Sequence, residues 1–239
     1  QGFPLDAAIP FSRDLNLRYY DMKILIINPN SSVEMSAAIQ NVAEIYANGD
    51  FEVKTVPTPN APEYIDYYID QAIAAPGMMQ IVKENEAEYD AFIVACHCDP
   101  NLDLLKQITD KPVVGIGEAS MKLATMLGHS FSVVSAGKHS IPNKRALIHK
   151  YGLDNDCASV RGPKDDFDDP TVEGPYLNAA QIAMEEDLAE VIVLGWFRRY
   201  VREDVRRAGR SRSGWRGQRT DHCHRFGEGG LHHQQDPPL

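Results

Sequence analysis

The chain has 239 residues, of which 43% are hydrophobic, 24% charged and 8% aromatic, a composition typical of soluble globular proteins. This length is enough for one or two domains with a hydrophobic core. No window approaches the ~18 consecutive apolar residues of a membrane span, and the start of the chain has no basic segment followed by an apolar one. We therefore expect no membrane partner and a cytoplasmic protein.

The formal net charge of -10 is unevenly distributed. Residues 196–239 contain ten arginines, no lysine and five acidic residues, whereas the rest of the chain is strongly acidic. An acidic body offers nucleic acid no electrostatic surface, so we expect no nucleic-acid partner. The basic segment would suit a nucleic-acid arm, but its sequence favours the different interpretation given below.

From Met22 onwards, short β-branched runs alternate with amphipathic stretches. This alternation predicts an α/β fold with parallel sheet covered on both faces, whose ligands bind outside the carboxyl ends of the strands. The longest helical region should break or kink at Pro76-Gly77. The expected strands are 23–28, 51–56, 91–95, 112–116, 130–135, 158–161 and 191–194, and the expected helices are 33–47, 63–88, 102–108, 119–127, 142–150 and 173–187.

Two segments fall outside this pattern. Residues 1–21 begin with Gln and precede a Met that opens the first strand, so we interpret them as a leader or cloning residue; an arm that packs on a neighbour is the alternative. After Gly195, helical periodicity ceases and the sequence RRAGRSRSGWRGQRT is arginine-rich and of low complexity. A folded α/β protein is not expected to end in this way.

Polar and reactive residues gather in three loops that follow predicted strands. The loops are Asn28-Pro29-Asn30-Ser31-Ser32, Cys96-His97-Cys98-Asp99-Pro100 and Gly115-Ile116-Gly117-Glu118-Ala119-Ser120. All three should lie on one rim of the sheet, and we count Glu118 among the candidate substrate-binding residues. The first loop also suits a helix N-cap, whose free N–H groups bind anions or carbonyl oxygens; capping alone is the simpler interpretation.

Cys96 is the strongest single candidate. It follows a buried apolar strand and precedes a helix expected to open at Pro100 or Asn101, so a positive helix end should lower its thiol pKa. A thiolate at this place would act as a base or a nucleophile. The alternative is a small buried hydrophobic residue at a strand end.

The other cysteines do not point to a disulfide framework or to a metal. Four cysteines are too few and too unevenly spaced for such a framework, so we expect free thiols. Three consecutive residues, Cys-His-Cys, fit poorly with the usual spacing of zinc ligands, and we expect no metal site. The four are Cys96, Cys98, Cys157 and Cys223.

The segments MKILIINPNSS, DQAIAAPGMMQIVKENEAEYDAFIVACHCDPNLDLLKQITDKPVVGIGEAS and EVIVLG together resemble the hydantoin and allantoin racemases of the aspartate/glutamate racemase superfamily. The resemblance runs from Met22 to Gly195. It implies two similar α/β domains, 22–117 and 118–195, each with a parallel central sheet, with the active site in the cleft between them. It also implies no cofactor, a small-molecule substrate and a possible homo-oligomer.

The resemblance further implies that Cys96 is one of two catalytic cysteines and that Asn30 and Ser31 help to hold the substrate. In this family mechanism one thiolate removes a proton next to a carbonyl, and a thiol on the opposite face returns one. The second cysteine should follow the last strand in a Gly-Cys-Ala-Gly-Met context. This chain instead reads Gly195-Trp196-Phe197-Arg198-Arg199, so the second domain is truncated and activity should be impaired.

A frameshift near Gly195 explains this departure. Back-translated one base out of register, residues 196–200 can encode Gly-Ser-Ala-Gly-Met. The single codon of Trp215 and the run at 232–235 are also compatible with that frame, and the whole segment can then read as an ending of the family type. We therefore interpret residues 196–239 as an aberrant, frameshifted tail.

Two other functions stay open. An aspartate- or glutamate-type racemase would need more cationic or hydroxyl anchors than these loops offer. The alternative from a different functional class is a non-catalytic remnant or a binding protein. It arises because loss of the helices that close the second domain would expose apolar sheet surface.

Overall fold

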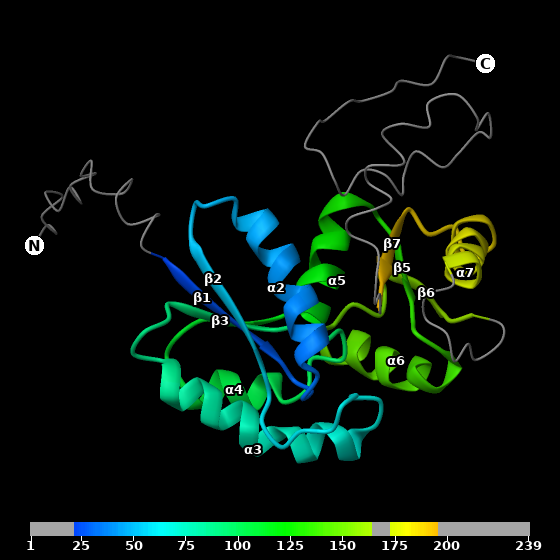
Figure 1. Cartoon of the computed structure of the whole chain (residues 1–239). Helices are drawn as coiled ribbons and strands as arrows, with labels where there is room; N and C mark the ends of the chain where they lie inside the picture. Colours follow the sequence, from blue (N-terminus) through cyan, green and yellow to red (C-terminus); the bar gives the residue numbers. More distant parts are fainter. Residues whose placement is uncertain (1–21, 164–172, 196–239) are drawn as a thin grey trace, which may run out of the picture. The chain divides into compact units, whose positions relative to one another are not determined.

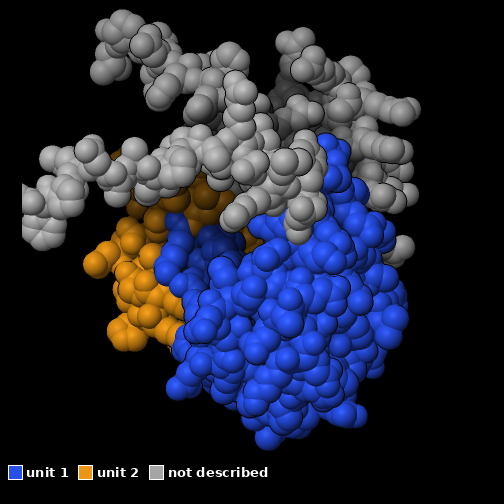
Figure 2. Space-filling model, turned by 90° about the vertical axis from the view of Figure 1, so that its left-hand side faces the viewer, with its two compact units in different colours: residues 1–122 blue, residues 123–239 orange. Residues whose placement is uncertain are grey.

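The computed structural model describes residues 22–163 and 173–195 (Figure 1). The chain divides into two compact units, residues 1–122 and 123–239, which Figure 2 shows in separate colours. They are called the first and the second unit. The division falls inside one helix, close to the expected boundary between residues 117 and 118. The expected leader and the expected aberrant tail lie outside the described residues.

The first unit contains a four-stranded parallel sheet in the order β2-β1-β3-β4. Parallel strands, each followed by a helix, are the arrangement that the alternating sequence pattern predicts, and the α/β fold class is confirmed. In chain order the unit contains β1 (Lys23–Asn28), α2 (Val33–Ala47), β2 (Glu52–Pro57), α3 (Tyr68–Asn85), β3 (Ala91–Val94), α4 (Leu102–Ile108), β4 (Val113–Gly115) and most of α5 (Ile116–Leu127).

One hydrophobic core fills the space between this sheet and helices α3 and α4. The strands contribute alternate residues, as a pleated sheet with one face on a core requires. The two helices add their apolar stripes, and α2 lies against the opposite face, toward β2 (Figure 1). Buried members of the core are Leu25, Ile27, Ala74, Met78, Ile81, Val82, Tyr89, Phe92, Val94, Leu102, Leu105 and Val113.

A glutamine of α2 covers part of the exposed edge of the outer strand β2. Gln40 donates from Nε2 to the Val53 carbonyl at 2.9 Å and accepts the Thr55 N–H at 2.6 Å. Edge strands leave such backbone groups unpaired, and a side-chain amide can satisfy a donor and an acceptor together. Gln40 therefore blocks this part of the edge against pairing with another strand.

Helix α3 differs from the expectation in two ways. It begins at Tyr68 rather than near residue 63, and it continues as one α-helix through Pro76. Buried residues on both sides of the proline, Ala74 and Met78, belong to the same core, so packing stabilises both halves of the helix. The predicted break is therefore wrong, whereas a kink at Pro76-Gly77 stays a prediction. Gly77 permits a close approach, because a Cβ there would lie 2.5 Å from the Pro59 carbonyl oxygen.

The second unit contains a three-stranded parallel sheet in the order β6-β5-β7. The first strand of this unit is central, with the second on one side and the third on the other, as in the β2-β1-β3 part of the first unit. The two sheets therefore repeat one topology. In the described residues of this unit, the elements are the end of α5, β5 (Phe131–Val134), a 3₁₀ turn η1 (Lys138–Ser140), α6 (Ile141–Lys150), β6 (Cys157–Arg161), α7 (Glu173–Glu185) and β7 (Val191–Leu194).

A polar network joins β6 to the end of α7 in this unit. Asp187 accepts hydrogen bonds from the Arg161 guanidinium and from Ser159 Oγ, and Ser159 also contacts Ser132 Oγ at 2.8 Å. The Arg161 hydrogen bonds hold the pKa of Asp187 below its usual range. The Arg161–Asp187 ion pair is half-buried, so it connects helix and sheet without leaving a charge unpaired.

Within the described ranges, no helix is both long and apolar enough to cross a membrane.

Candidate functional site

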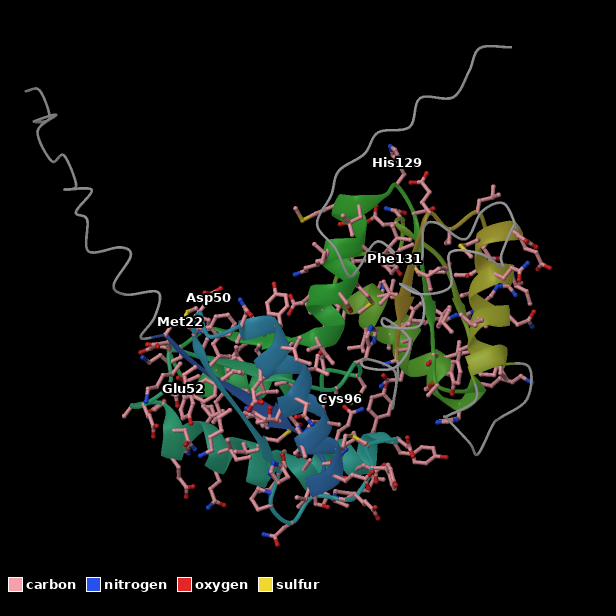
Figure 3. The ribbon with its side chains drawn as sticks, turned by 45° about the horizontal axis from the view of Figure 1, so that its top comes forward. Met22, Asp50, Glu52, Cys96, His129 and Phe131 are labelled. Atoms are coloured by element: carbon pink, nitrogen blue, oxygen red, sulfur yellow. The ribbon has the colours of Figure 1, made fainter. Side chains whose placement is uncertain are left out.

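The three polar loops of the first unit lie at the same edge of its sheet, as expected. Val94 pairs with Ile27 of β1 and with Gly115 of β4, so the residues that follow these strands emerge side by side. Figure 3 shows Cys96 at this carboxyl edge, whereas Met22 and Glu52 lie at the opposite, amino edge. The carboxyl edge is where parallel α/β sheets bind ligands.

The first loop is held by Asn28, the last residue of β1. Its Nδ2 group donates to Asn30 Oδ1 at 2.7 Å and to Ser36 Oγ at 3.0 Å. The Thr58 hydroxyl donates to the Asn28 carbonyl at 2.7 Å. Ser32 caps α2 by accepting the Met35 N–H at 3.2 Å. Sequence reasoning assigned Asn28 no role, although an amide at the last strand position is a signal of such a network.

The two candidates of this loop have different surroundings. Asn30 is only 5% exposed, and its Oδ1 accepts from both Asn28 and the Ser32 N–H, so its side chain organises the loop. Ser31 is half-buried, and its N–H donates to the Pro62 carbonyl at 3.0 Å. Its hydroxyl has no hydrogen bond to another residue of the described ranges. Ser31 is therefore the more exposed of the two, and the substrate-binding roles of both residues stay predictions.

The second loop forms a tight turn that ends on a buried aspartate. The Asp99 N–H donates to the Cys96 carbonyl at 2.9 Å, which closes the turn over His97 and Cys98. Asp99 is 4% exposed and has a φ of 43°, in the left-handed region that Asp tolerates better than most residues. Its carboxylate accepts the Gly117 N–H at 2.9 Å and the Glu118 N–H at 2.6 Å.

Asp99 thus caps helix α5 from a different loop, and this explains why α5 begins at Ile116 rather than at Ala119 as expected. The glycines of the third loop make room for the cap. A Cβ at Gly115 would lie 2.3 Å from Asp99 Oδ1, and one at Gly117 would lie 2.7 Å from Asp99 Oδ2. Ser120 of α5 adds a contact of 3.1 Å to His97 Nε2. The second and third loops are therefore one rigid substructure.

Cys96 and Cys98 face each other in this substructure. Their sulfur atoms are 3.2 Å apart, and both residues are half-buried thiols. The helix that follows, α4, runs from Leu102 to Ile108 as expected, with Asn101 as its N-cap residue. At α5, the first-turn N–H groups of Gly117 and Glu118 bind the Asp99 carboxylate. The expected helix-end effect on Cys96 stays a prediction.

Glu118 has two lysine partners. Its carboxylate contacts Lys106 Nζ at 2.6 Å and Lys122 Nζ at 2.5 Å. Burial alone would raise the pKa of Glu118, but the hydrogen bonds and charges of the two lysines outweigh it and lower that pKa. This carboxylate is engaged within the protein, so a substrate-binding role for Glu118 stays a prediction that its contacts do not favour.

The Glu118→Gln variant should lose the stability that these ion pairs contribute. A carboxyl whose pKa is lowered on folding stabilises the protein above its unfolded pKa of about 4.3, and that stability is lost as the pH falls through the folded pKa. We expect a loss of about 1 kcal/mol or less at pH 7, the range of partly exposed ion pairs. Urea unfolding at pH 7 and near pH 3 measures it. A difference from the unsubstituted chain that is unchanged at the lower pH would contradict this assignment.

The third described cysteine differs from the pair. Burial raises the pKa of the Cys157 thiol to about 11, so about one molecule in a thousand carries a thiolate there at pH 8. We expect a thiol reagent at pH 8 to label Cys96 well before Cys157, as measured by peptide mass against time. Equal labelling of the two would leave Cys96 as an ordinary buried cysteine.

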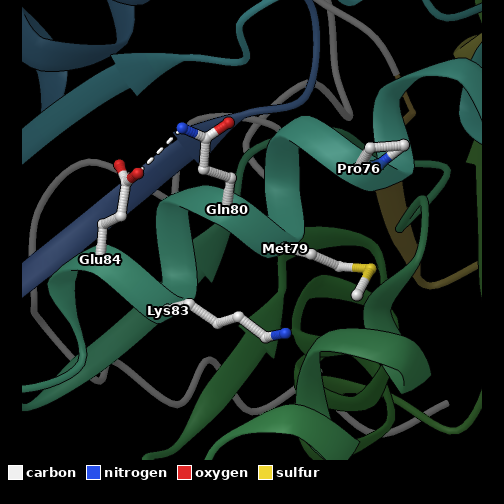
Figure 4. Close-up of a pocket in the computed structure, with 5 residues that line it drawn as sticks. All are labelled: Pro76, Met79, Gln80, Lys83 and Glu84. Atoms are coloured by element: carbon white, nitrogen blue, oxygen red, sulfur yellow. Dashed lines mark hydrogen bonds between the residues drawn. The ribbon is translucent and has the colours of Figure 1, made fainter.

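A surface hollow on helix α3 is separate from the three loops. It encloses about 560 Å³ and is lined by five residues of this one helix (Figure 4). Gln80 and Glu84 bond to each other across one turn at 2.8 Å. A hollow made by one helix, without a converging polar group from another element, is not the kind of pocket that holds a substrate. Its lining residues are Pro76, Met79, Gln80, Lys83 and Glu84.

Metal ligands do not converge in the described parts of the chain. No group of three or more His, Cys, Asp or Glu side chains that could hold an ion occurs in residues 22–163 and 173–195. Cys223 and the histidines of the tail lie outside these ranges.

Comparison with known proteins gives the family. The Asp/Glu/Hydantoin racemase family profile matches residues 24–195. The chain belongs to this family. The "Hydantoin racemase" of a Pseudomonas species is 37% identical over 180 residues, which are 73% of this chain and 72% of that protein. The "Hydantoin racemase" of Paenarthrobacter aurescens is 32% identical, over 73% and 77% of the two chains.

Solved structures agree with this membership. The allantoin racemase from Klebsiella pneumoniae superposes with a TM-score of 0.68 at 29% identity, over 73% of this chain and 74% of that one. The allantoin racemase from Pseudomonas fluorescens gives 0.64 at 28% identity, over 73% and 76%. The resemblance inferred from the sequence is confirmed, and the chain is classed with isomerases that act as racemases.

Proposed function

We propose that the chain derives from a cofactor-independent racemase of a five-membered cyclic ureide, of the hydantoin or allantoin type, in which Cys96 is one of two proton-transferring groups. The observation that carries this proposal is the position of Cys96. It lies at the carboxyl edge of the sheet, in a fixed turn, in a chain whose named relatives are hydantoin and allantoin racemases.

In the proposed reaction the Cys96 thiolate removes the proton from the ring carbon next to a carbonyl group. Negative charge then develops on that carbonyl oxygen as an enolate, and a hydrogen-bond donor aimed at it lowers the barrier. The N–H groups of Ser31 and Ser32 are bonded within the protein, so we assign this contact to the Ser31 hydroxyl. Asn30 then acts by fixing the loop that carries Ser31.

A neutral ureide fits this unit better than a dicarboxylic amino acid. Binding a second carboxylate calls for a cation near the loops. Lys106 and Lys122, the lysines that reach the third loop, are both bonded to Glu118. One carboxylate faces two ammonium groups, so the three side chains keep one positive charge, but both lysines are held by Glu118. This engagement supports the ureide over the aspartate- or glutamate-type substrate.

We propose that the second acid/base is missing from this chain. Cys96 lies two residues beyond Val94, the end of β3, and the repeated topology makes Leu194 of β7 the counterpart of Val94. The residue two positions beyond Leu194 is Trp196, which cannot transfer a proton. The family match also stops at residue 195. Both observations support a frameshift close to Gly195.

The other reading frame can encode Gly-Ser-Ala-Gly-Met, with serine where the family context has its second cysteine. The substrate assignment is therefore tested with a chain whose residues from 196 onward are replaced by that ending, with the serine changed to cysteine. Such a protein should abolish the optical rotation of an enantiopure hydantoin or of allantoin, without an added cofactor. Constant rotation of both ureides would refute the assignment. The frameshift is tested separately by the nucleotide sequence across the Gly195 codon; peptide masses that cover residues 196–239 as printed would refute it.

A further inference from the structure

The contact between Cys96 and Cys98 has a consequence beyond proton transfer. We propose that these two thiols form an oxidation site, at which a hydroperoxide converts them to an intrachain disulfide. The inference does not depend on the identity of the racemase substrate, because it concerns the sulfur chemistry of this turn.

The geometry of the turn favours the bond. The sulfur atoms are 3.2 Å apart, so they must approach by about 1 Å to reach the S–S length of about 2.05 Å. The hydrogen bond from the Asp99 N–H to the Cys96 carbonyl bends the chain over the residue between the cysteines. Two residues separated by one position in such a turn carry their side chains within bonding reach.

The neighbours of the cysteines keep the sulfurs together. His97, between them, is buried and contacts Ser120, and Asp99 is fixed by its two bonds to the start of α5. A turn anchored at both of these residues cannot swing Cys98 far from Cys96. The second thiol is therefore present at high effective concentration whenever the first becomes oxidised. Both sulfurs belong to half-buried residues, which leaves room for a small oxidant.

The chemistry balances with the hydroperoxide as oxidant. The Cys96 thiolate attacks the terminal peroxide oxygen, the O–O bond breaks, and an alkoxide leaves and takes a proton as the alcohol. Cys96 is then a sulfenic acid. The Cys98 sulfur attacks the Cys96 sulfur, the S–O bond breaks, and hydroxide leaves with the thiol proton as water. One S–S bond forms, and the two thiols lose two electrons and two protons in total.

The disulfide would remove the thiolate that the proposed function uses, so in an active enzyme it would stop proton transfer until a dithiol reduces it. That consequence rests on the proposed function. Formation of the disulfide does not depend on the proposed function, and the peptide mass alone detects it.

Trypsin cleavage isolates the relevant thiols. Cys96 and Cys98 fall in one peptide, residues 84–106, and Cys157 falls in another, residues 151–161. The full reduced chain is treated with hydrogen peroxide, denatured, alkylated with iodoacetamide and digested. We expect peptide 84–106 to lose the mass of two hydrogen atoms and to escape alkylation. Cys157 is the internal control and should stay alkylated, because burial raises the pKa of its thiol.

The Cys98→Ser variant separates the disulfide from simple oxidation. In this variant Cys96 should gain oxygen instead of losing hydrogen. Treatment of the oxidised unsubstituted chain with dithiothreitol should restore two alkylation sites. A trivalent arsenical, which bridges adjacent thiols, should protect the same peptide from alkylation in the unsubstituted chain. This check does not depend on whether a variant folds. Oxygen uptake on peptide 84–106 without hydrogen loss, or a cross-link to the Cys157 or Cys223 peptide, would overturn the proposal.

Discussion

The Cys96→Ser variant should lose the ability to exchange the ring-carbon proton of a hydantoin or allantoin enantiomer with solvent. A serine hydroxyl is a far weaker base than a thiolate, and a positioned acid/base group contributes about 10²–10⁴-fold to such a step. We expect the exchange rate in D₂O to fall by at least about 100-fold. Proton NMR of the substrate measures it directly, because the signal of the exchanging proton disappears with time.

The matched control is Cys157→Ser, since Cys157 belongs to the second unit and bonds to the Ser159 carbonyl through its sulfur. It should exchange the substrate proton as fast as the unsubstituted chain. Equal rates for the Cys96→Ser variant and the unsubstituted chain would remove Cys96 from the mechanism.

The Asp99→Ala variant should be the most destabilising single change in the loops of the first unit. It removes the acceptor for two N–H groups of α5, opens a small cavity, and places alanine at a left-handed backbone position. Unsatisfied buried donors cost about 1–3 kcal/mol each, so we expect a loss of about 2–4 kcal/mol. The urea midpoint of the far-UV circular dichroism signal measures the change.

Two further variants serve as comparisons for the stability of Asp99→Ala. Asp99→Asn keeps one acceptor oxygen and tolerates the left-handed backbone, so it should lose less than Asp99→Ala. Asp110→Ala removes an exposed aspartate that follows α4 and should change the midpoint little. If the midpoint of Asp99→Ala coincided with that of Asp110→Ala, Asp99 would not be the cap that joins the two loops.

The fold could be predicted largely because local sequence patterns indicate most of its helices and strands. Strands β1 and β7 and helices α2 and α4 have the predicted ends, since apolar β-branched runs and helical periodicity change at those residues. The predicted break at Pro76 was wrong, because the core contacts that stabilise the helix on both sides of the proline are long-range. The start of α5 was misplaced for the same reason, since its cap is Asp99, a residue of the preceding loop.

The candidate site was predictable in position but not in detail. The ends of parallel strands place Asn30, Cys96 and Glu118 at one edge of the sheet. Spacing alone could not show that Lys106 and Lys122 bind Glu118, or that the Cys98 sulfur touches that of Cys96. Such contacts depend on rotamers and on the shape of the turn. The Gly115-Ile116-Gly117 sequence was the available signal for a close neighbour, because glycine is needed where a Cβ does not fit.

The ratio of exchange to inversion tests the account most directly. The chain as printed is incubated in D₂O with each pure enantiomer of one cyclic ureide, and chiral separation with mass detection then follows deuterium uptake and inversion in the same sample. With Cys96 present and the second acid/base absent, we predict slow deuterium uptake into one enantiomer at most, with little inversion. Inversion as fast as uptake would contradict the account, because it requires a second proton-transferring group opposite Cys96 in this chain.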